Sequence, residues 1–200
     1  PVLVAGSTLK GEEEAIVRAF NRLRTIDPST SLGAGSNALL VLAARQPERF
    51  AEVERLCRQE GLSTIRRTEL PIDAEPRADA VVLDTIGELA EVYQIATVVF
   101  VGGSLVRAGG HNILEPAVFG KPIVFGPHME NFAEIAETFL ANDAAVQVRS
   151  RRELEAVILS LMGDPVRRAR LGAAARALVE ANRGAKGKTL EVMAVVVAPQ

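Results

Sequence analysis

The chain has 200 residues, a formal net charge of −2 and one cysteine. This charge gives no support for a nucleic-acid surface held by bulk electrostatics, and a single cysteine excludes an internal disulfide and a multi-cysteine metal site. The composition is 48% hydrophobic with few aromatic residues, which is typical of an α/β domain whose strands are covered on both faces. No apolar run reaches the roughly 18 residues of a membrane span, and no signal peptide is visible.

Strand-like and helix-like segments alternate through the first half of the chain. Apolar, β-branched runs predict strands, and amphipathic stretches with capping or proline start signals predict helices. The acidic first turn of the first helix suits the positive end of the helix dipole. The predicted strands are 1–5, 38–43, 64–67 and 80–83, the helices are 11–24 and 47–60, and residues 27–37 and 71–78 are polar connections.

The second half opens on a buried strand that breaks at once into a glycine-rich loop. The segments predicted after it are strands at 97–101, 122–125 and 144–148 and helices at 113–119, 131–140, 150–162, 164–182 and 185–197. This alternation indicates a Rossmann-like, doubly wound parallel sheet of about seven strands with extra C-terminal helices. We interpret residues 1–200 as one domain and, since the sequence opens on a strand without a methionine, expect it to be a fragment of a longer protein.

Polar residues follow the carboxyl ends of several predicted strands, and these ends lie along the sheet edge where ligands bind in open α/β folds. Ser7 and Thr8 offer hydroxyl and N–H groups, and Arg45 offers a planar cation suited to phosphate. The helix starts predicted at Gly87 and Asn112 offer further N–H donors. Glycines in the loop 102–110 would let the backbone approach a ligand closely. We therefore expect a phosphate at this edge.

Glu115 adds a carboxylate whose two oxygens match a pair of neighbouring sugar hydroxyls. The spacing of Asn112 and Glu115 is also that of a capping box, so the closing of a helix end is an alternative role for both. His111 and His128 lie in adjoining loops, where either a ligand contact or a local hydrogen bond is compatible with histidine. A sugar nucleotide fits this set of residues, with its phosphate at the helix ends and its ribose at the carboxylate.

Several other kinds of site are disfavoured by missing patterns. No GxGxxG follows the first strand, and GxxxxGK[ST] and GxSxG are absent from the sequence, which argues against a nicotinamide dehydrogenase, a P-loop hydrolase and a serine nucleophile. The two histidines lie in no HxxxH or CxxC pattern, so no metal site is predicted.

Four motifs together carry a resemblance to a known family. They are Gly6-Ser7-Thr8 with Gly11-Glu12-Glu13; Arg45-x-Pro47-Glu48-Arg49-Phe50; Asp84-Thr85-x-Gly87-Glu88-Leu89; and Phe100-Val101-Gly102-Gly103-Ser104-Leu105 with Gly109-Gly110-His111-Asn112-x-Leu114-Glu115-Pro116-Ala117 and Gly126-Pro127-His128. In this order, over essentially the whole chain, they resemble the carboxy-terminal half of the 3-deoxy-D-manno-octulosonic acid (Kdo) transferases of Gram-negative lipopolysaccharide assembly.

The resemblance implies one half of a GT-B glycosyltransferase, in which two Rossmann-like domains face a cleft. The second domain, which this chain resembles, holds the donor CMP-Kdo, and the first holds the lipid A precursor that accepts Kdo. The donor-binding positions implied are Ser7, Thr8, Arg45, Gly87, Glu88, Gly110, His111, Asn112 and Glu115. Leu9 and Gln46 stand where the family often has histidine, and Ile113 stands where it often has proline.

The implied reaction transfers Kdo with inversion. Arg45 and the helix starts at Gly87 and Asn112 would stabilise charge on the departing CMP phosphate without a metal or other cofactor. The general base belongs to the family's amino-terminal domain, so no catalytic residue is expected in this chain. We expect the isolated domain to be soluble, to bind donor weakly and to turn over nothing. The parent enzyme would work at the cytoplasmic face of the bacterial inner membrane and touch it only through the other half.

Two alternatives stay open at this point. One is a related enzyme, either a GT-B transferase that uses a UDP-sugar or a sugar-nucleotide epimerase. The other is a nucleotide-binding module without catalysis. No nucleic-acid partner is expected.

Overall fold

The fold is built on one parallel sheet of seven strands. A computed structural model describes residues 1–25, 38–71 and 75–197. The strand order is β3-β4-β2-β1-β5-β6-β7, and every neighbouring pair is parallel, which confirms the predicted doubly wound sheet. The strands are β1 (Val2–Thr8), β2 (Leu39–Ala44), β3 (Thr64–Arg66), β4 (Ala80–Val82), β5 (Val98–Val101), β6 (Ile123–Phe125) and β7 (Val146–Gln147).

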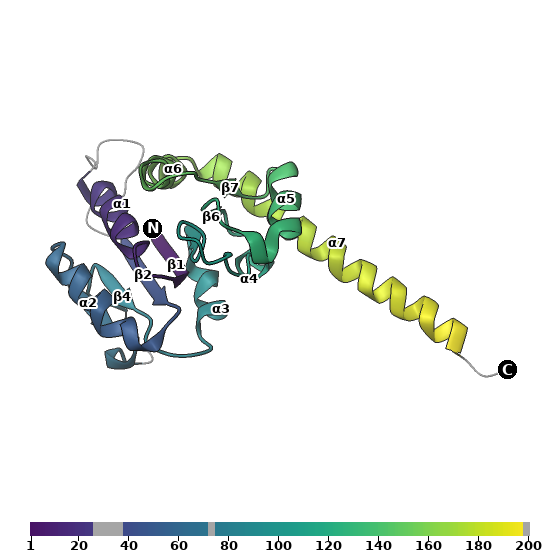
Figure 1. Ribbon diagram of the computed structural model, residues 1–200, viewed down its shortest axis with the longest axis horizontal. Helices are drawn as coiled ribbons and strands as arrows, with labels where there is room; N and C mark the ends of the chain where they lie inside the picture. The colour runs from purple at the N-terminus through teal and green to yellow at the C-terminus, as the bar shows by residue number, and fades with distance from the viewer. Residues whose placement is uncertain (26–37, 72–74, 198–200) are drawn as a thin grey trace.

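Helices cover both faces of the sheet (Figure 1). One core joins Leu3 and Ala5 of β1 to α1 (Glu13–Thr25), α2 (Phe50–Gln59) and α6 (Arg151–Gly163). The other core joins Val4 of the same strand to α3 (Leu89–Val92), α4 (Leu114–Val118), α5 (Ala133–Ala141) and α7 (Pro165–Val197). Alternate side chains of one strand therefore enter opposite cores, as a strand buried on both faces requires. Short 3₁₀ turns lie at Pro47–Arg49, Arg67–Glu69, Tyr93–Ile95 and Glu130–Phe132.

The strand order reverses between β1 and β5. The chain places β2, β3 and β4 on one side of β1 and then adds β5, β6 and β7 on the other side. Loops that leave the carboxyl ends of β1 and β5 therefore diverge to opposite faces, which is where open α/β sheets bind ligands. The first strand is longer than predicted, because Ser7 and Thr8 belong to it. A register irregularity between Gly6 and Thr8 lets the strand continue alongside β2.

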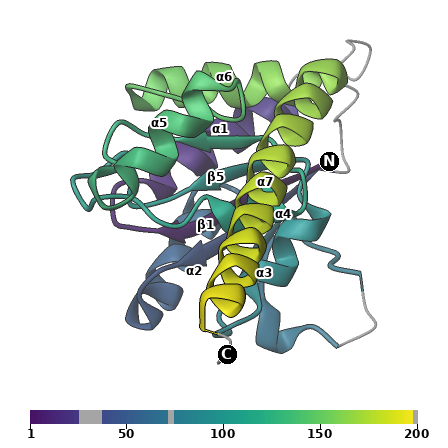
Figure 2. The same cartoon turned by 90° about the vertical axis from the view of Figure 1, so that its right-hand side faces the viewer.

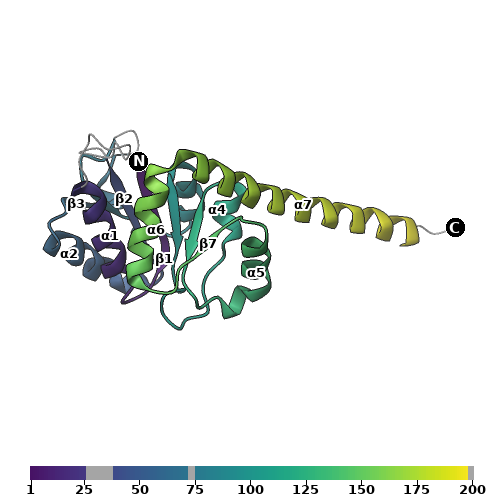
Figure 3. The same ribbon diagram turned by 90° about the horizontal axis from the view of Figure 1, so that it is seen from above.

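The C-terminal helix is continuous, so the predicted division into helices 164–182 and 185–197 was wrong. Gly184 weakens a helix but, unlike proline, keeps its N–H, and the backbone stays helical through it. Beyond its crossing of α4, α7 projects away from the rest of the domain, as Figures 1 and 3 show. In the described ranges, no helix has the length and apolarity that crossing a membrane demands. The predicted loop 27–37 lies outside the described residues.

The crossing of α7 over the end of α4 depends on two glycines (Figure 2). A Cβ built on Gly172 would overlap the carbonyl oxygen of Gly120, which is a backbone atom that cannot turn aside. Gly120 itself has a positive φ of 63°. The absence of a side chain at Gly172 is therefore what allows α7 to lie against the α4–β6 turn.

We predict that Gly172→Ala destabilises the protein. In an exposed helix interior the same change stabilises by about 1 kcal/mol, whereas overpacking against rigid backbone costs about 1–3 kcal/mol. Urea unfolding measures the difference. Ala173→Gly, at the exposed neighbouring position, is the control and should show only the helix-propensity loss. If Gly172→Ala were more stable than the unmodified chain, α7 and the α4–β6 turn would have to move apart to accommodate the added methyl group.

Candidate functional site

A small pocket lies at the carboxyl ends of β1, β2 and β4. Its volume is about 180 Å³, and three of the predicted residues line it: Ser7, Arg45 and Gly87. The rest of the lining is mostly apolar and consists of Ala43, Ala44, Pro47, Phe50, Leu83, Thr85, Ile86 and Leu89. The pocket thus combines apolar walls with one exposed guanidinium, which suits a ring that carries an anionic group.

The end of β1 is held in an unusual conformation at this pocket. Ser7 has a φ of 55°, a left-handed value that a residue with a side chain adopts at a cost. Gly102 packs so closely on the carbonyl of Ser7 that a Cβ there would overlap it. Thr8 is fully buried, and its carbonyl accepts the N–H of Arg45 at 2.9 Å. Thr8 therefore supports the backbone of Arg45, and the direct donor contact expected of its side chain stays a prediction.

The loop after β4 supplies Gly87 and Glu88, and a helix begins there as predicted, with Glu88 at its N-cap, but this helix is short. α3 has four residues and α4 has five, and so few peptide units produce only a weak dipole. The carboxylate of Glu88 accepts the hydroxyl of Thr85 at 2.7 Å and pairs with Arg67 at 3.2 Å. These bonds fix the loop that carries Gly87, whose φ is 96°.

The second group of predicted residues follows β5. The side chain of Asn112 accepts the N–H of Leu114 at 3.0 Å and donates to Glu115 at 3.3 Å. Asn112 and Glu115 thus bond to each other where the capping-box alternative placed them, although the local turn differs from that box. Glu115 also lies near the buried Tyr93, whose pKa is raised by burial and secondarily by that carboxylate. A Cβ atom at position 6 would overlap the Tyr93 hydroxyl, so glycine at this position leaves room for the tyrosine ring.

His111 connects the two groups of residues. Its ring lies against Gly103, and its Nε2 atom is buried without a hydrogen-bond partner in the described part of the chain. The pKa of His111 is lowered by burial and, to a smaller extent, by the positive charge of Arg45. Arg45 is therefore near enough to His111 for their charges to interact. The other histidine, His128, places Nδ1 3.2 Å from a carboxylate oxygen of Glu130.

The loop 102–105 differs from its prediction. Its glycines predicted a close approach of the backbone to a ligand, but the N–H groups of Gly103, Ser104 and Leu105 donate to the carboxylate of Glu12 at 2.8 to 3.0 Å. Sequence reasoning assigned Glu12 only to the helix dipole and missed this contact. The signal in the sequence was the run of three consecutive acids, Glu12 to Glu14, at the start of the helix.

Arg49 is a second residue whose role the sequence did not show. It forms a two-pronged ion pair with Glu13, with Nη1 to Oε1 at 2.7 Å and Nη2 to Oε2 at 3.3 Å. Both side chains are at least 90% buried. The pair joins the start of α1 to the segment that follows Arg45, so it stabilises one wall of the pocket.

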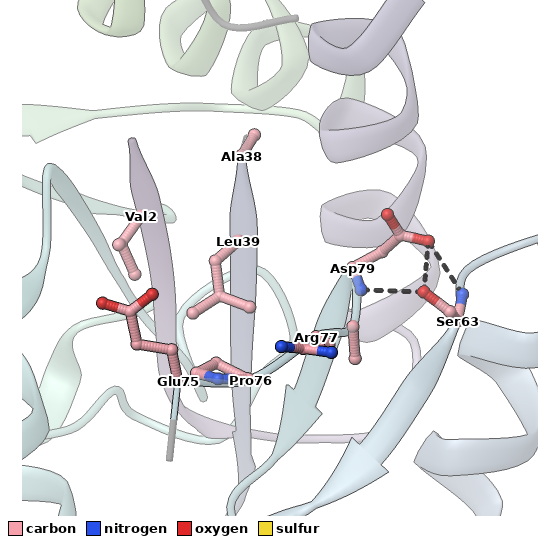
Figure 4. Close-up of a pocket in the computed structure, with 9 residues that line it drawn as sticks. Val2, Ala38, Leu39, Ser63, Glu75, Pro76, Arg77 and Asp79 are labelled. Carbon is pink, nitrogen blue, oxygen red and sulfur yellow. Dashed lines mark hydrogen bonds between the residues drawn. The ribbon is translucent and has the colours of Figure 1, made fainter. Parts of the chain in front are cut away.

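A larger pocket, of about 650 Å³, lies at the opposite edge of the sheet (Figure 4). It is lined by the amino ends of β1 and β2 and by residues that precede β4, including Asp79. Asp79 already accepts two hydrogen bonds from Ser63 and pairs with Arg24 at 2.9 Å. None of the predicted donor-site residues lines this pocket, and we assign no ligand to it. Within the described ranges, no three metal-binding side chains come together.

We predict that Arg45→Ala raises the pKa of His111 while leaving it below the usual histidine value of about 6.5, because burial, the larger cause, remains. An NMR titration of the His111 imidazole Cε1–H in the unmodified chain and in the variant measures this. Since the folded pKa is the lower one, the unfolded state binds more protons between the two values, and stability is lost as pH falls through that window. An unchanged His111 pKa would contradict the proximity of Arg45.

Known proteins share the sequence and the fold of this chain. No protein-family model matches the chain. A 3-deoxy-D-manno-octulosonic acid transferase of Haemophilus influenzae is 36% identical over 196 residues, which are 96% of this chain and 43% of that protein. The chain thus spans less than half the length of this curated relative. A calicheamicin glycosyltransferase, CalG4, has a TM-score of 0.54 at 16% identity over 100% of this chain and 43% of its own, so it shares the fold alone.

A solved structure of similar length extends this relationship. It is the crystal structure of the C-terminal CMP-Kdo binding domain of WaaA from Acinetobacter baumannii, with 32% identity and a TM-score of 0.76 over 89% of this chain and 88% of that domain. Identity above 30% across nearly the whole of both chains is accompanied by the same parallel α/β fold. The chain belongs to the Kdo transferase family and corresponds to the C-terminal domain of those GT-B glycosyltransferases.

Proposed function

We propose that this domain binds CMP-Kdo at the carboxyl edge of its sheet and presents it for transfer to a lipid A precursor. The observation that carries the proposal is the match to the CMP-Kdo binding domain over 88% of that domain's length. The acceptor and the general base would come from an amino-terminal domain of the parent enzyme. The isolated chain would therefore bind donor without turnover, and contact with the inner membrane would be made through the other domain.

The geometry supports separate places for the parts of the nucleotide. The pocket of about 180 Å³ has the apolar walls that a pyrimidine ring requires, and Arg45 is exposed at its side. We assign the base to this pocket and the phosphate to Arg45. Glu115 belongs to α4, which follows β5 on the other side of β1, and its carboxylate can accept hydrogen bonds from ribose hydroxyls. Arg45 would also stabilise the charge that develops on CMP as the bond to Kdo breaks.

We predict that the 200-residue chain binds CMP in preference to UDP and NAD, as isothermal titration calorimetry can measure. Glu115→Ala should weaken CMP binding about tenfold, since a hydrogen bond to a charged group contributes about 1.5–3 kcal/mol. Glu134→Ala, an exposed carboxylate on α5, is the matched control and should leave affinity unchanged. Equal binding of the three nucleotides would contradict the donor assignment, and preference for UDP would favour a UDP-sugar enzyme.

The role of Arg45 can be tested by comparing two ligands that differ only in a phosphate. Arg45→Ala should weaken CMP about tenfold or more and leave cytidine unaffected, because only CMP offers the guanidinium an anion. Arg45→Lys should recover part of the loss. The control is Arg55→Ala, an exposed arginine on α2. If CMP and cytidine lost affinity equally, Arg45 would be shaping the pocket without contacting the phosphate.

A further inference from the structure

We propose that Glu12 is a positioning residue of the donor site, which holds Gly110 and His111 in place through the loop 102–105. The contacts of Glu12 support this positioning role. Its consequence for CMP rests on the proposed function.

Glu12 is fully buried, and its carboxylate accepts four backbone hydrogen bonds. One oxygen accepts the N–H groups of Leu9 at 2.9 Å and Gly103 at 2.8 Å. The other accepts those of Ser104 at 3.0 Å and Leu105 at 2.8 Å. A carboxylate is the side chain that can accept in this way at both oxygens. Glu12 therefore ties the loop after β1 to the loop after β5 across the reversal in strand order.

The clamped loop in turn holds the predicted donor residues. The carbonyl of Gly103 accepts the N–H of Gly110 at 2.9 Å, and Gly103 lies directly against the ring of His111. Its neighbour Ser104 accepts the N–H of His128 at its carbonyl, at 2.9 Å, and that of Gly126 at its hydroxyl, at 2.8 Å. Displacement of the loop would thus move the segments after both β5 and β6.

Glu12 also determines where an anionic ligand can bind. Consecutive N–H groups that converge after a residue with positive φ form a nest of the kind that takes phosphate, and Gly103 has a φ of 67°. Here the protein's own carboxylate fills that nest. The phosphate of the donor would therefore bind at Arg45 and at the segment after Gly109. The carboxylate of Glu12 also positions that segment.

The test compares Glu12→Gln with Glu54→Gln, a second buried carboxylate, in the full 200-residue chain. Glutamine at position 12 keeps the size of the side chain but turns an NH₂ group towards two N–H donors. Glutamine at position 54 weakens the ion pairs of that carboxylate with Arg58 and Arg66, and none of these three residues lines the pocket at the carboxyl edge. Both variants should lose stability. Amide hydrogen exchange, resolved by NMR at a temperature where both are folded, then reports on each loop, and calorimetry reports on CMP.

We expect Glu12→Gln to speed exchange at Gly103, Leu105 and Gly110 at least tenfold and to weaken CMP about tenfold. Glu54→Gln should change neither. Unchanged exchange at these amides in Glu12→Gln, or equal loss of CMP affinity in both variants, would overturn the positioning role. If the unmodified chain bound no CMP, the proposed function would fail, while exchange at Gly110 would still decide whether Glu12 positions the loop. If Glu12→Gln does not fold, Glu12→Asp takes its place in the test, because aspartate keeps the charge but has a shorter side chain.

Discussion

The carboxyl edge of this sheet depends on one buried carboxylate and the four N–H groups it accepts. Burying a charge is costly unless hydrogen bonds replace the lost water, and Glu12 receives two such bonds at each oxygen. Burial raises the pKa of Glu12 and the backbone N–H groups oppose that rise, so these two effects compete at the same group. Without Glu12, buried N–H groups would lose their acceptor at about 1–3 kcal/mol each. The loop and the carboxylate therefore require each other.

The first turn of α1 organises more than one loop of the site. Glu12 holds the segment after β5, while Glu13 pairs with Arg49 in the segment after β2. Two neighbouring residues thus fix loops that lie on opposite sides of β1. Because both side chains are buried, neither contact is screened by solvent as a surface ion pair would be. The segments that carry Arg45 and His111 are therefore each held by one residue of this turn.

The sequence predicted the elements better than it predicted the contacts between them. All seven strands were found, because a buried strand is a local run of apolar residues. The extension of β1 through Ser7 was missed, since a bulge leaves no mark on that pattern. Ser7, Arg45 and Gly87 were correctly expected at one edge because parallel strands share their direction. Glu12 and Arg49 looked like ordinary surface charges, and their burial is decided by partners far along the chain.

The glycines illustrate why local patterns mislead at this site. Glycine-rich loops suggest a backbone open to a ligand, yet Gly6 makes room for Tyr93 and Gly102 for the carbonyl of Ser7. Gly103 likewise approaches His111. The loops are packed against the protein itself, so they are ordered before any ligand arrives and little further ordering entropy is lost on binding. Anionic ligands can then be distinguished only by the few groups that internal contacts leave exposed. Among the residues that line the pocket, Arg45 is the one with a charged side chain, and it is exposed.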